Sequence, residues 1–377
     1  MTRQPKILYL VTEDWYFCSH RLPLAAAARR AGYDVAVATT LYRHEERIRA
    51  EGIRPIPFGM ARAGLNPLRD FMTLLQLIRL YRTEKPELVH HVAMKPVLYG
   101  AIAARAAGIS RRIHALAGLG YLFSSQDARA CALRRPVTAL LRWLLKGDRS
   151  RVILQNADDR DLFIRELSLV PAQIRLIRGS GVDPDVFRPT PEPQGTPVVM
   201  LASRMLRDKG VREFAEAARC CKTRGVEARF VLVGEPDPQN PSSIPRAELE
   251  AWHASGILEW WGAREDMAGV FSQAHVVCLP SYREGLPKVL LEAAACGRPI
   301  ITTDTPGCRE IVQHGENGYL VPVRAVTELA DAVEHLAGNA FLRQAMGRAG
   351  RRRIEEEFST ERVVSETLQV YAELLQS

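Results

Sequence analysis

The chain has 377 residues, of which 47% are hydrophobic and 25% charged, a globular composition with length enough for two domains. No apolar run approaches the ~20 residues that span a bilayer, and no signal peptide is recognised, which predicts a cytoplasmic protein. Its seven cysteines include no Cys-x-x-Cys pair, which argues against zinc sites and disulfides. The net charge of +8 divides into +13 for residues 1–190 and −5 for the rest, so the first half is expected to face an anionic partner.

Strand-like and helix-like periods alternate along the first half, as expected for parallel βα units. Strands are predicted at Ile7–Val11, Asp34–Thr39, Arg54–Phe58, Leu88–Val92, Arg112–Leu116, Val152–Gln155 and Ile174–Ile177. Helices are predicted at Leu22–Ala31, Leu68–Thr83, Val97–Ala107, Pro136–Lys146 and Asp159–Leu167. The segment Thr12–Arg21 is expected to be a loop.

A proline-rich stretch interrupts this alternation, because residues 187–197 hold four prolines and one glycine, which neither helix nor strand tolerates. Strands are then predicted at Val198–Ala202, Arg229–Val233, Leu258–Trp261, Val276–Leu279, Pro299–Thr302 and Gly318–Val321. Helices are predicted at Val211–Arg224, Pro245–His253, Asp266–Gln273, Pro287–Cys296, Val326–Ala337, Leu342–Glu357 and Thr360–Gln376. The predicted domains are residues 1–187 and 198–358, with a linker at 188–197 and a final helical segment, 359–377, that has room to cross back to the first domain.

The most informative segment is Ser281–Pro299, which begins where a strand ends and a helix follows, the usual place for ligands in α/β sheets. Gly285 would let the backbone approach a ligand closely, and a helix starting at Pro287 would point its first N–H groups at a diphosphate. Glu284 and Glu292 could contact two parts of one extended ligand. The alternative is that Glu292 is a surface helix residue and Glu284 a partner of the helix dipole.

A second segment, Ser203–Gly210, follows the first strand of the second half. It carries Arg204 and Lys209, and these residue types bind phosphate oxygens as a bidentate fork and as a point charge. A solvated basic turn is the alternative.

Together these segments resemble family 4 glycosyltransferases. The resemblance extends to Thr302–Glu310, Asn317–Val321 and Gly179–Asp183, in order and at suitable spacing. It implies an α/β protein of the GT-B fold, with two Rossmann-like doubly wound domains facing across a cleft. It also implies that sugar is transferred with retention of configuration, with a nucleotide-sugar as co-substrate, no cofactor and no metal.

The resemblance assigns roles to individual residues. Arg204 and Lys209 would hold the donor diphosphate and stabilise the charge developing on the leaving group. Glu292 would bind the ribose hydroxyls, and Glu284 would contact the transferred sugar. The backbone facing the diphosphate would be that of Gly285, Leu286, Pro287 and Lys288.

The N-terminal half resembles a narrower group, through Ala61–Pro67, Lys95 and Gly118–Gly120. These look like transferases that add N-acetylhexosamine or related sugars to undecaprenyl-diphosphate-linked glycans, which favours UDP as the donor nucleotide. A lipid-linked saccharide acceptor at an anionic membrane surface would suit the positive charge of this half. The basic, apolar helix within Leu133–Lys146 is expected either to lie on the inner face of the membrane or to be an ordinary core-facing helix.

Contacts to the acceptor or the transferred sugar are expected from His20, Arg21, His91, Lys95 and Gly118. The histidine that other relatives carry just before this glycine is replaced by Ala117, and His20 and His91 are predicted to face the ligand from strand ends instead. Either histidine is alternatively structural.

Several other interpretations were compared with the sequence. Asp183-Pro-Asp185 spells a DxD metal motif but precedes the linker, so no metal site is predicted. A nicotinamide-dependent dehydrogenase would need a GxGxxG fingerprint, and a nucleic-acid-binding protein a groove-reading or stacking motif; neither is found. A GT-B nucleotide-sugar epimerase, or a transferase to a soluble acceptor, stays open.

Overall fold

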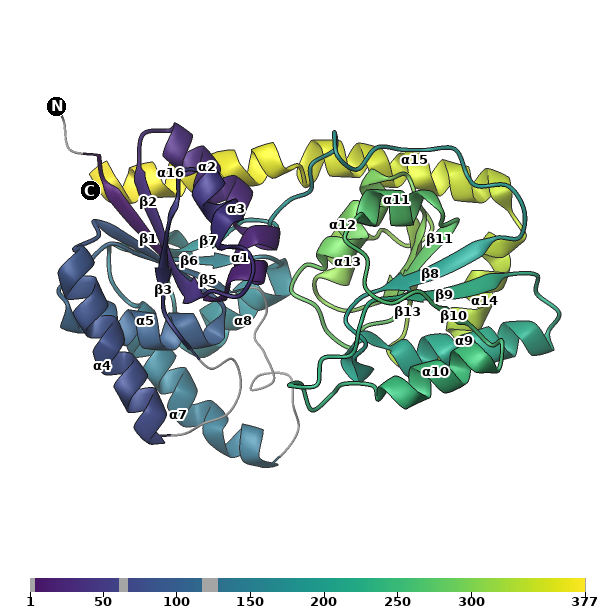
Figure 1. The fold of residues 1–377 in the computed structure, drawn as a ribbon, viewed down its shortest axis with the longest axis horizontal. Coiled ribbons are helices and arrows are strands. Elements are labelled where there is room, and N and C mark those ends of the chain that lie inside the picture. Colours follow the sequence, from purple (N-terminus) through teal and green to yellow (C-terminus); the bar gives the residue numbers. More distant parts are fainter. Residues whose placement is uncertain (1–3, 61–66, 117–127, 377) are drawn as a thin grey trace. The chain divides into compact units, whose positions relative to one another are not determined.

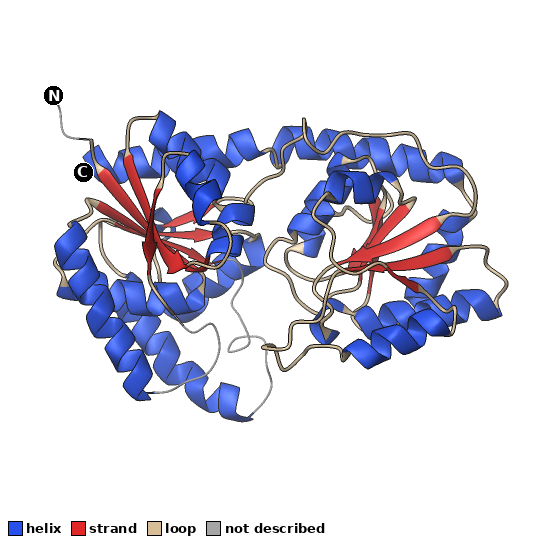
Figure 2. Ribbon diagram, viewed as in Figure 1, coloured by secondary structure: helices blue, strands red, loops and turns tan. Residues whose placement is uncertain are grey.

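The computed structural model describes residues 4–60, 67–116 and 128–376, with the backbone alone for 128–133. The chain divides into two compact units, one made of residues 1–180 and 360–377 and the other of residues 181–359 (Figure 1). Each unit has a parallel sheet with helices on both faces (Figure 2). Among the described residues, no helix combines the length and apolarity needed to cross a bilayer.

The N-terminal unit has a seven-stranded parallel sheet in the order β3-β2-β1-β4-β5-β6-β7. Its strands are β1 Lys6–Glu13, β2 Asp34–Thr40, β3 Arg54–Pro57, β4 Leu88–Val92, β5 Arg112–Leu116, β6 Ser150–Leu154 and β7 Ile174–Leu176. Its helices are α1 Asp14–His20, α2 Leu22–Arg30, α3 Glu45–Ala50, α4 Pro67–Glu84, α5 Met94–Ala106, α7 Ala128–Leu145, α8 Ala157–Leu167 and the returning α16 Thr360–Gln376. Helix α16 packs against α2 and β4.

The C-terminal unit has a six-stranded parallel sheet in the order β10-β9-β8-β11-β12-β13. Its strands are β8 Val198–Ala202, β9 Arg229–Val233, β10 Glu259–Trp260, β11 Val276–Leu279, β12 Ile300–Thr303 and β13 Gly318–Val321. Its helices are α9 Val211–Thr223, α10 Arg246–Ala254, α11 Met267–Ser272, α12 Lys288–Ala295, α13 Cys308–Ile311, α14 Val326–Ala337 and α15 Ala340–Glu357.

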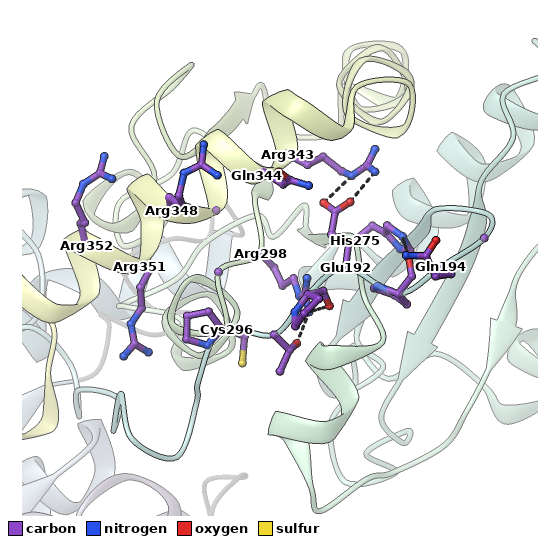
Figure 3. Close-up of a pocket in the computed structure, with 17 residues that line it drawn as sticks. Glu192, Gln194, His275, Cys296, Arg298, Arg343, Gln344, Arg348, Arg351 and Arg352 are labelled. Atoms are coloured by element: carbon purple, nitrogen blue, oxygen red, sulfur yellow. Dashed lines mark hydrogen bonds and ion pairs between the residues drawn. The ribbon is translucent and has the colours of Figure 1, made fainter.

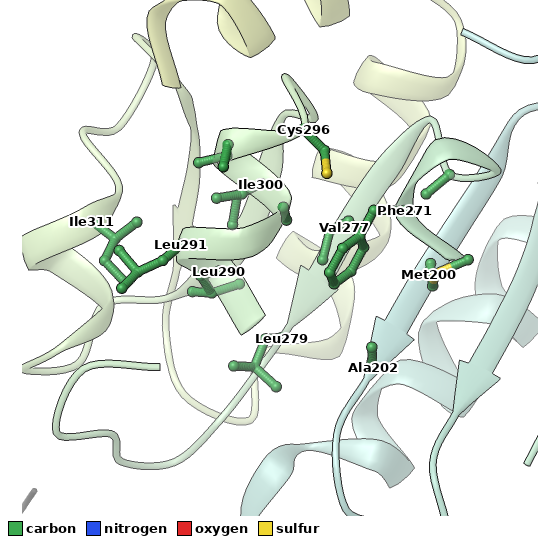
Figure 4. Packing of buried hydrophobic residues seen from close by; sticks show 14 of the residues in the cluster. Met200, Ala202, Phe271, Val277, Leu279, Leu290, Leu291, Cys296, Ile300 and Ile311 are labelled. Carbon is green, nitrogen blue, oxygen red and sulfur yellow. The ribbon is translucent and has the colours of Figure 1, made fainter. Parts of the chain in front are cut away.

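The central strands are buried on both faces, which is why they read as unbroken apolar runs. In β8, Met200 and Ala202 join one hydrophobic cluster while Val199 and Leu201 join the other. Figure 4 shows the first cluster, in which Met200 shares a core with side chains from α11, α12 and β11. The predicted doubly wound α/β architecture of both halves is therefore confirmed, with every expected strand present to within two residues.

Local differences from the sequence predictions have physical causes. The expected loop Thr12–Arg21 contains the end of β1 and the short helix α1, and α3 and α13 were also not predicted, because helices of four to seven residues are too short to show a period. Helix α7 begins at Ala128, so Pro136 lies inside it rather than at its start.

The proline-rich segment 188–197 is not a free linker, because it belongs to the C-terminal unit and the division falls between Ser180 and Gly181. Arg343 forms an ion pair with Glu192 at 2.8 Å, and the ring of His275 hydrogen bonds to the carbonyl of Pro193 at 3.0 Å. Proline excludes regular structure but not packing, so its density alone misplaced the boundary.

Candidate functional site

The sheet order of the C-terminal unit creates a switch point between β8 and β11. After β8 the chain crosses to β9 on one side, and after β11 it crosses to β12 on the other. The loops that leave these neighbouring strands therefore diverge, and ligands of α/β proteins bind in such crevices at the carboxyl ends of strands. These two loops are residues 203–210 and 280–287. They overlap the segments Ser203–Gly210 and Ser281–Pro299, which were predicted from the sequence to bind the donor.

Lys209 and Glu284 meet at this switch point. The Lys209 ammonium lies 2.5 Å from Oε1 of Glu284, and the Ser281 hydroxyl donates to the same oxygen at 2.5 Å. Both charged side chains keep part of their surface exposed, 23% for Lys209 and 10% for Glu284. The pair is therefore accessible to a ligand.

Arg204 is exposed and lies in the same loop as Lys209. Its guanidinium is 2.8 Å from a carboxylate oxygen of Asp237, which follows β9. Each cation of the predicted phosphate-binding segment is thus held by a carboxylate, Lys209 by Glu284 and Arg204 by Asp237.

Two glycines allow the loops of the site to approach one another. Gly210 has φ of +72°, and a Cβ there would lie 2.1 Å from the carbonyl oxygen of Pro280. A Cβ on Gly307 would lie 2.3 Å from the carbonyl oxygen of Gly285. A side chain at either position would push loops apart, so the backbone at the site depends on both glycines.

Helix α12 begins at Lys288 and presents its first turn at this site. Pro287 is its N-cap and provides no side-chain cap, which leaves first-turn N–H groups available to an anion. Lys288 lies 3.1 Å from Glu292 one turn later. Burial raises the pKa of Glu292, and the neighbouring Lys288 charge opposes the rise only in part.

A tyrosine that the sequence did not single out supports the loop after β11. The Tyr282 hydroxyl donates to Glu213 of α9 at 2.6 Å, and the Arg324 guanidinium lies 4.6 Å from the centre of the Tyr282 ring. Arg324 has φ of +65°, a conformation that no sequence period reveals. This cluster anchors the loop that carries Glu284.

In the N-terminal unit, His20 and Arg21 follow β1 at the end of α1. The His20 ring stacks on Tyr16 with centroids 4.2 Å apart, and its Nδ1 is 2.6 Å from the Ser19 hydroxyl. Arg21 is buried and its Nη1 donates to the carbonyl of Gly179 at 3.4 Å. Helix α1 therefore separates both residues from the end of β1, whereas the sequence prediction placed His20 at the strand end itself.

His91 does not face a ligand, which corrects the sequence prediction. Its ring is fully buried in β4, with Nε2 2.9 Å from the Tyr81 hydroxyl and Nδ1 3.2 Å from Nδ1 of His114. Burial, aided by the Arg112 charge, lowers the pKa of His91 to about 3. In a strand buried on both faces, alternation cannot tell a core-facing side chain from a cavity-facing one.

Lys95 lies in the first turn of α5, where its ammonium is 3.2 Å from Asp70 of α4 and 5.5 Å from the ring centre of Tyr99. The preceding Ala93 has φ of +79°, at the carboxyl end of β4. Strained backbone of this kind gathers at functional sites. Gly118 and the motif residues 61–66 lie outside the described residues.

Asp183 and Asp185, the apparent DxD motif, are occupied within their own turn. Asp183 Oδ1 accepts hydrogen bonds from the backbone N–H groups of Asp185 and Val186, and Asp185 faces Arg188 at 3.4 Å. Within the described parts of the chain, no three His, Cys, Asp or Glu side chains gather into a metal-binding group.

Comparisons with known proteins agree with this geometry. Residues 196–339 match the family model of group 1 glycosyl transferases, and residues 6–156 match that of glycosyl transferase 4-like domains. The N,N'-diacetylbacillosaminyl-diphospho-undecaprenol alpha-1,3-N-acetylgalactosaminyltransferase of Campylobacter jejuni is 28% identical over 86% of this chain and 87% of its own. The UDP-Gal:alpha-D-GlcNAc-diphosphoundecaprenol alpha-1,3-galactosyltransferase of Escherichia coli is 25% identical over 82% of this chain and 81% of its own.

Solved structures support the same fold. Sucrose-phosphate synthase of Thermosynechococcus elongatus superposes with a TM-score of 0.80 and 22% identity, covering 99% of this chain and 100% of its own. HepE of Anabaena, in complex with UDP and glucose, superposes with a TM-score of 0.77 and 17% identity, covering 98% of this chain and 100% of its own. The chain belongs to the glycosyltransferases of the GT-B fold, with a glycosyl transferase 4-like domain in its first half and a group 1 domain in its second.

Proposed function

We propose that this glycosyltransferase moves a sugar, an N-acetylhexosamine or a related hexose, from a UDP donor to a saccharide linked to a lipid diphosphate. Two relatives that each cover more than 80% of the chain are named for diphospho-undecaprenol-linked acceptors, and one of them is also named for a UDP-sugar donor. A third relative of comparable coverage is named as a glycosyltransferase without an acceptor. Such a reaction extends a lipid-linked glycan in the biosynthesis of a surface polysaccharide.

The observation that carries the donor assignment is the Lys209–Glu284 pair at the switch point. A diphosphate placed between the loops after β8 and β11 would meet Lys209, Arg204 and the first turn of α12. Lys209 and Arg204 each give up a carboxylate partner for phosphate oxygens, which are ligands of higher charge. Glu284, released from Lys209, is then free to accept hydrogen bonds from the hydroxyls of the transferred sugar.

The same groups supply the chemistry of transfer. As the bond between sugar and diphosphate breaks, negative charge grows on the leaving diphosphate, and fixed cations and helix N–H groups stabilise it. We propose that the transfer proceeds with retention of configuration. We also propose that it needs no metal, because side chains and helix N–H groups of the chain itself supply the positive charge. The carboxylates of Asp183 and Asp185 interact within their own turn, so the proposal gives them no part in binding the nucleotide-sugar.

The acceptor is proposed to be reached at an anionic membrane surface through the N-terminal unit. Four exposed apolar side chains on α4, Leu68, Phe71, Met72 and Leu75, have the i, i+3, i+4, i+7 spacing that lines one face of a helix. Helices α4 and α7 both pack against α5. Helix α7 carries the basic residues Arg134, Arg135 and Arg142, and Lys146 follows its last residue. Apolar insertion beside cationic side chains suits an interfacial helix on anionic lipid.

Helix α7 packs one face on the core, where Leu141, Leu144 and Leu145 are fully buried. Among the α7 residues whose side chains are described, the large exposed apolar residues are Leu140 and Trp143. The apolar part of the proposed membrane surface is therefore placed on α4, and α7 contributes charge.

A donor panel tests the proposed reaction. UDP- and GDP-sugars are incubated with the enzyme in the presence of EDTA, and nucleotide release is measured. Release from a UDP-sugar that persists in EDTA is expected. Loss of activity in EDTA that manganese or magnesium restores would contradict the metal-free mechanism, and release from GDP-sugars alone would contradict the UDP assignment.

A further inference from the structure

A cavity lies in the C-terminal unit, at the opposite end of the parallel strands from the Lys209–Glu284 site. Its volume is about 740 Å³, and it is bounded by segment 189–195, by the turn at Cys296–Arg298 and by α15 (Figure 3). His275, which precedes β11, and Arg298, which precedes β12, place it at the amino ends of these strands. The proposed donor site lies at the carboxyl ends of these strands, so this cavity is separate from it.

Arginine dominates the lining of this cavity, which we call the arginine pocket. Five arginines line it, Arg298, Arg343, Arg348, Arg351 and Arg352, against a single acidic residue, Glu192. Glu192 is already bound in a two-point ion pair to Arg343, at 3.0 and 2.8 Å. Arg351 faces Glu355 at 2.6 Å, so three guanidinium groups have no carboxylate within ion-pair distance among the described residues.

Of the three arginines without a carboxylate partner, Arg298 is the buried one, with 2% of its surface exposed. Its hydrogen bonds go to neutral oxygens, namely the carbonyls of Phe271, Ser272 and Pro191 and the hydroxyl of Thr190. Burial lowers the pKa of this guanidinium, which reflects the cost of a desolvated positive charge. An anion in the pocket would offset that cost.

Arg348 and Arg352 stand at the rim of the pocket, one helical turn apart on α15 (Figure 3). Both are exposed, and neither forms an ion pair with any described residue. Like charges at this spacing repel each other on a helix. A bound anion would remove that repulsion while the exposed guanidinium groups are free to turn toward it.

We propose that the arginine pocket binds a small phosphorylated compound. Its volume lies within the roughly 300–1,000 Å³ typical of small-molecule sites. Guanidinium groups bind phosphate oxygens bidentately, while Pro189, Pro191 and Pro193 provide an apolar wall for the organic part of the ligand. Cys296, in the pocket wall, ends the helix whose first turn lies at the donor site, so the ligand would contact a structural element shared with that site.

Inorganic pyrophosphate tests this proposal by titration calorimetry. The full chain carrying Arg204→Ala and Lys209→Ala is used, which weakens binding at the donor site. Saturable pyrophosphate binding is expected in this background, and adding Arg348→Ala and Arg352→Ala is expected to weaken it at least about tenfold. Both added changes are at exposed positions, so the fold is retained, and a melting curve checks this.

The matched control adds Arg219→Ala and Lys222→Ala instead, which removes the same charge from the exposed face of α9. This control is expected to leave pyrophosphate affinity unchanged. No saturable binding in the Arg204→Ala/Lys209→Ala background would overturn the proposal. Equal weakening by the control pair, or no weakening by the Arg348/Arg352 pair, would also overturn it.

Discussion

The ammonium of Lys209 lies 2.5 Å from a carboxylate oxygen of Glu284, although the two residues come from loops that leave different strands. The contact exists because β8 and β11 are neighbours in the sheet while their crossovers diverge. The cation proposed to bind phosphate and the carboxylate proposed to bind the sugar therefore lie next to each other.

Replacing Lys209 by alanine is expected to lower kcat/KM about 10²–10³-fold, because it removes one of the groups proposed to stabilise the leaving diphosphate. The measurement is nucleotide release from the preferred UDP-sugar. Lys222→Ala, an exposed lysine on α9, is the control and should behave as the parent enzyme. A Lys209→Ala enzyme at parental rate would remove Lys209 from the mechanism.

Arg204→Lys keeps the charge but loses the two-point geometry of the guanidinium. It is expected to raise the KM for the donor about tenfold, because a point charge binds phosphate with less geometric precision. The neighbouring Arg207→Lys, also exposed, should leave KM unchanged. An equal rise in KM for both variants would contradict a specific contact between Arg204 and the donor phosphates.

Glu292→Gln is expected to weaken donor binding while stabilising the fold at neutral pH. Burial raises the pKa of Glu292 in the folded state, so the ionised carboxylate costs stability, and this cost appears as pH rises above the unfolded-state value. Melting temperatures of parent and variant should converge below about pH 4 and separate in favour of the variant toward pH 7. A variant that melts lower than the parent at pH 7 would contradict this account.

Three buried histidines, His90, His91 and His114, are expected to make the N-terminal unit acid-sensitive. Burial lowers the pKa of each in the folded state, so the unfolded chain binds more protons and stability falls as pH drops below about 6.5. Each histidine contributes up to about 1.4 kcal/mol per pH unit. The free energy of unfolding, measured by urea titration between pH 7 and 5, checks the slope.

Replacing one of these three histidines tests whether they cause the loss of stability at low pH. His114→Gln removes one titrating ring and is expected to reduce the slope by that ring's share, whatever its effect on stability at pH 7. His253→Gln, at an exposed position on α10, is the control. An unchanged slope in His114→Gln would show that other groups carry the acid response.

The exposed apolar side chains of α4, together with the basic residues on and beside α7, predict membrane binding that weakens as salt rises. Phe71→Ser together with Leu75→Ser should reduce sedimentation with anionic vesicles and leave donor hydrolysis intact, because both side chains are exposed. Charge removal at Arg134, Arg135, Arg142 and Lys146 should act in the same direction and abolish the salt dependence. Neutral vesicles are the control, and equal binding to neutral and anionic vesicles would refute the electrostatic part.

Most of the fold was predictable because parallel strands buried on both faces leave continuous apolar runs. The run Val198–Ala202 was predicted residue for residue and lies between two hydrophobic clusters. Short helices were not predictable, since α1 spans only Asp14–His20 and shows no full period. The boundary at Gly181 was also missed, because arginine contacts to segment 188–197 are tertiary and leave no local signal.

The candidate site was predictable as a set of loops but not as a set of contacts. Sequence order placed Lys209 and Glu284 at strand ends, and the sheet order brought them together. The partner of Arg204, Asp237, lies in a loop without a recognisable motif. His91 shows the limit most clearly, because only the packing around β4 reveals that its ring is enclosed.

Transfer to a lipid-linked acceptor tests the central claim most directly. Radiolabelled UDP-N-acetylhexosamines and UDP-hexoses are incubated with undecaprenyl-diphosphate-linked monosaccharide and EDTA, and the label extracted into organic solvent is counted. The expected result is label in the lipid fraction with one UDP-sugar, absent with Lys209→Ala and present with Lys222→Ala. Label that stays in the aqueous phase with every donor, although the enzyme still consumes a UDP-sugar, would contradict the lipid-linked acceptor.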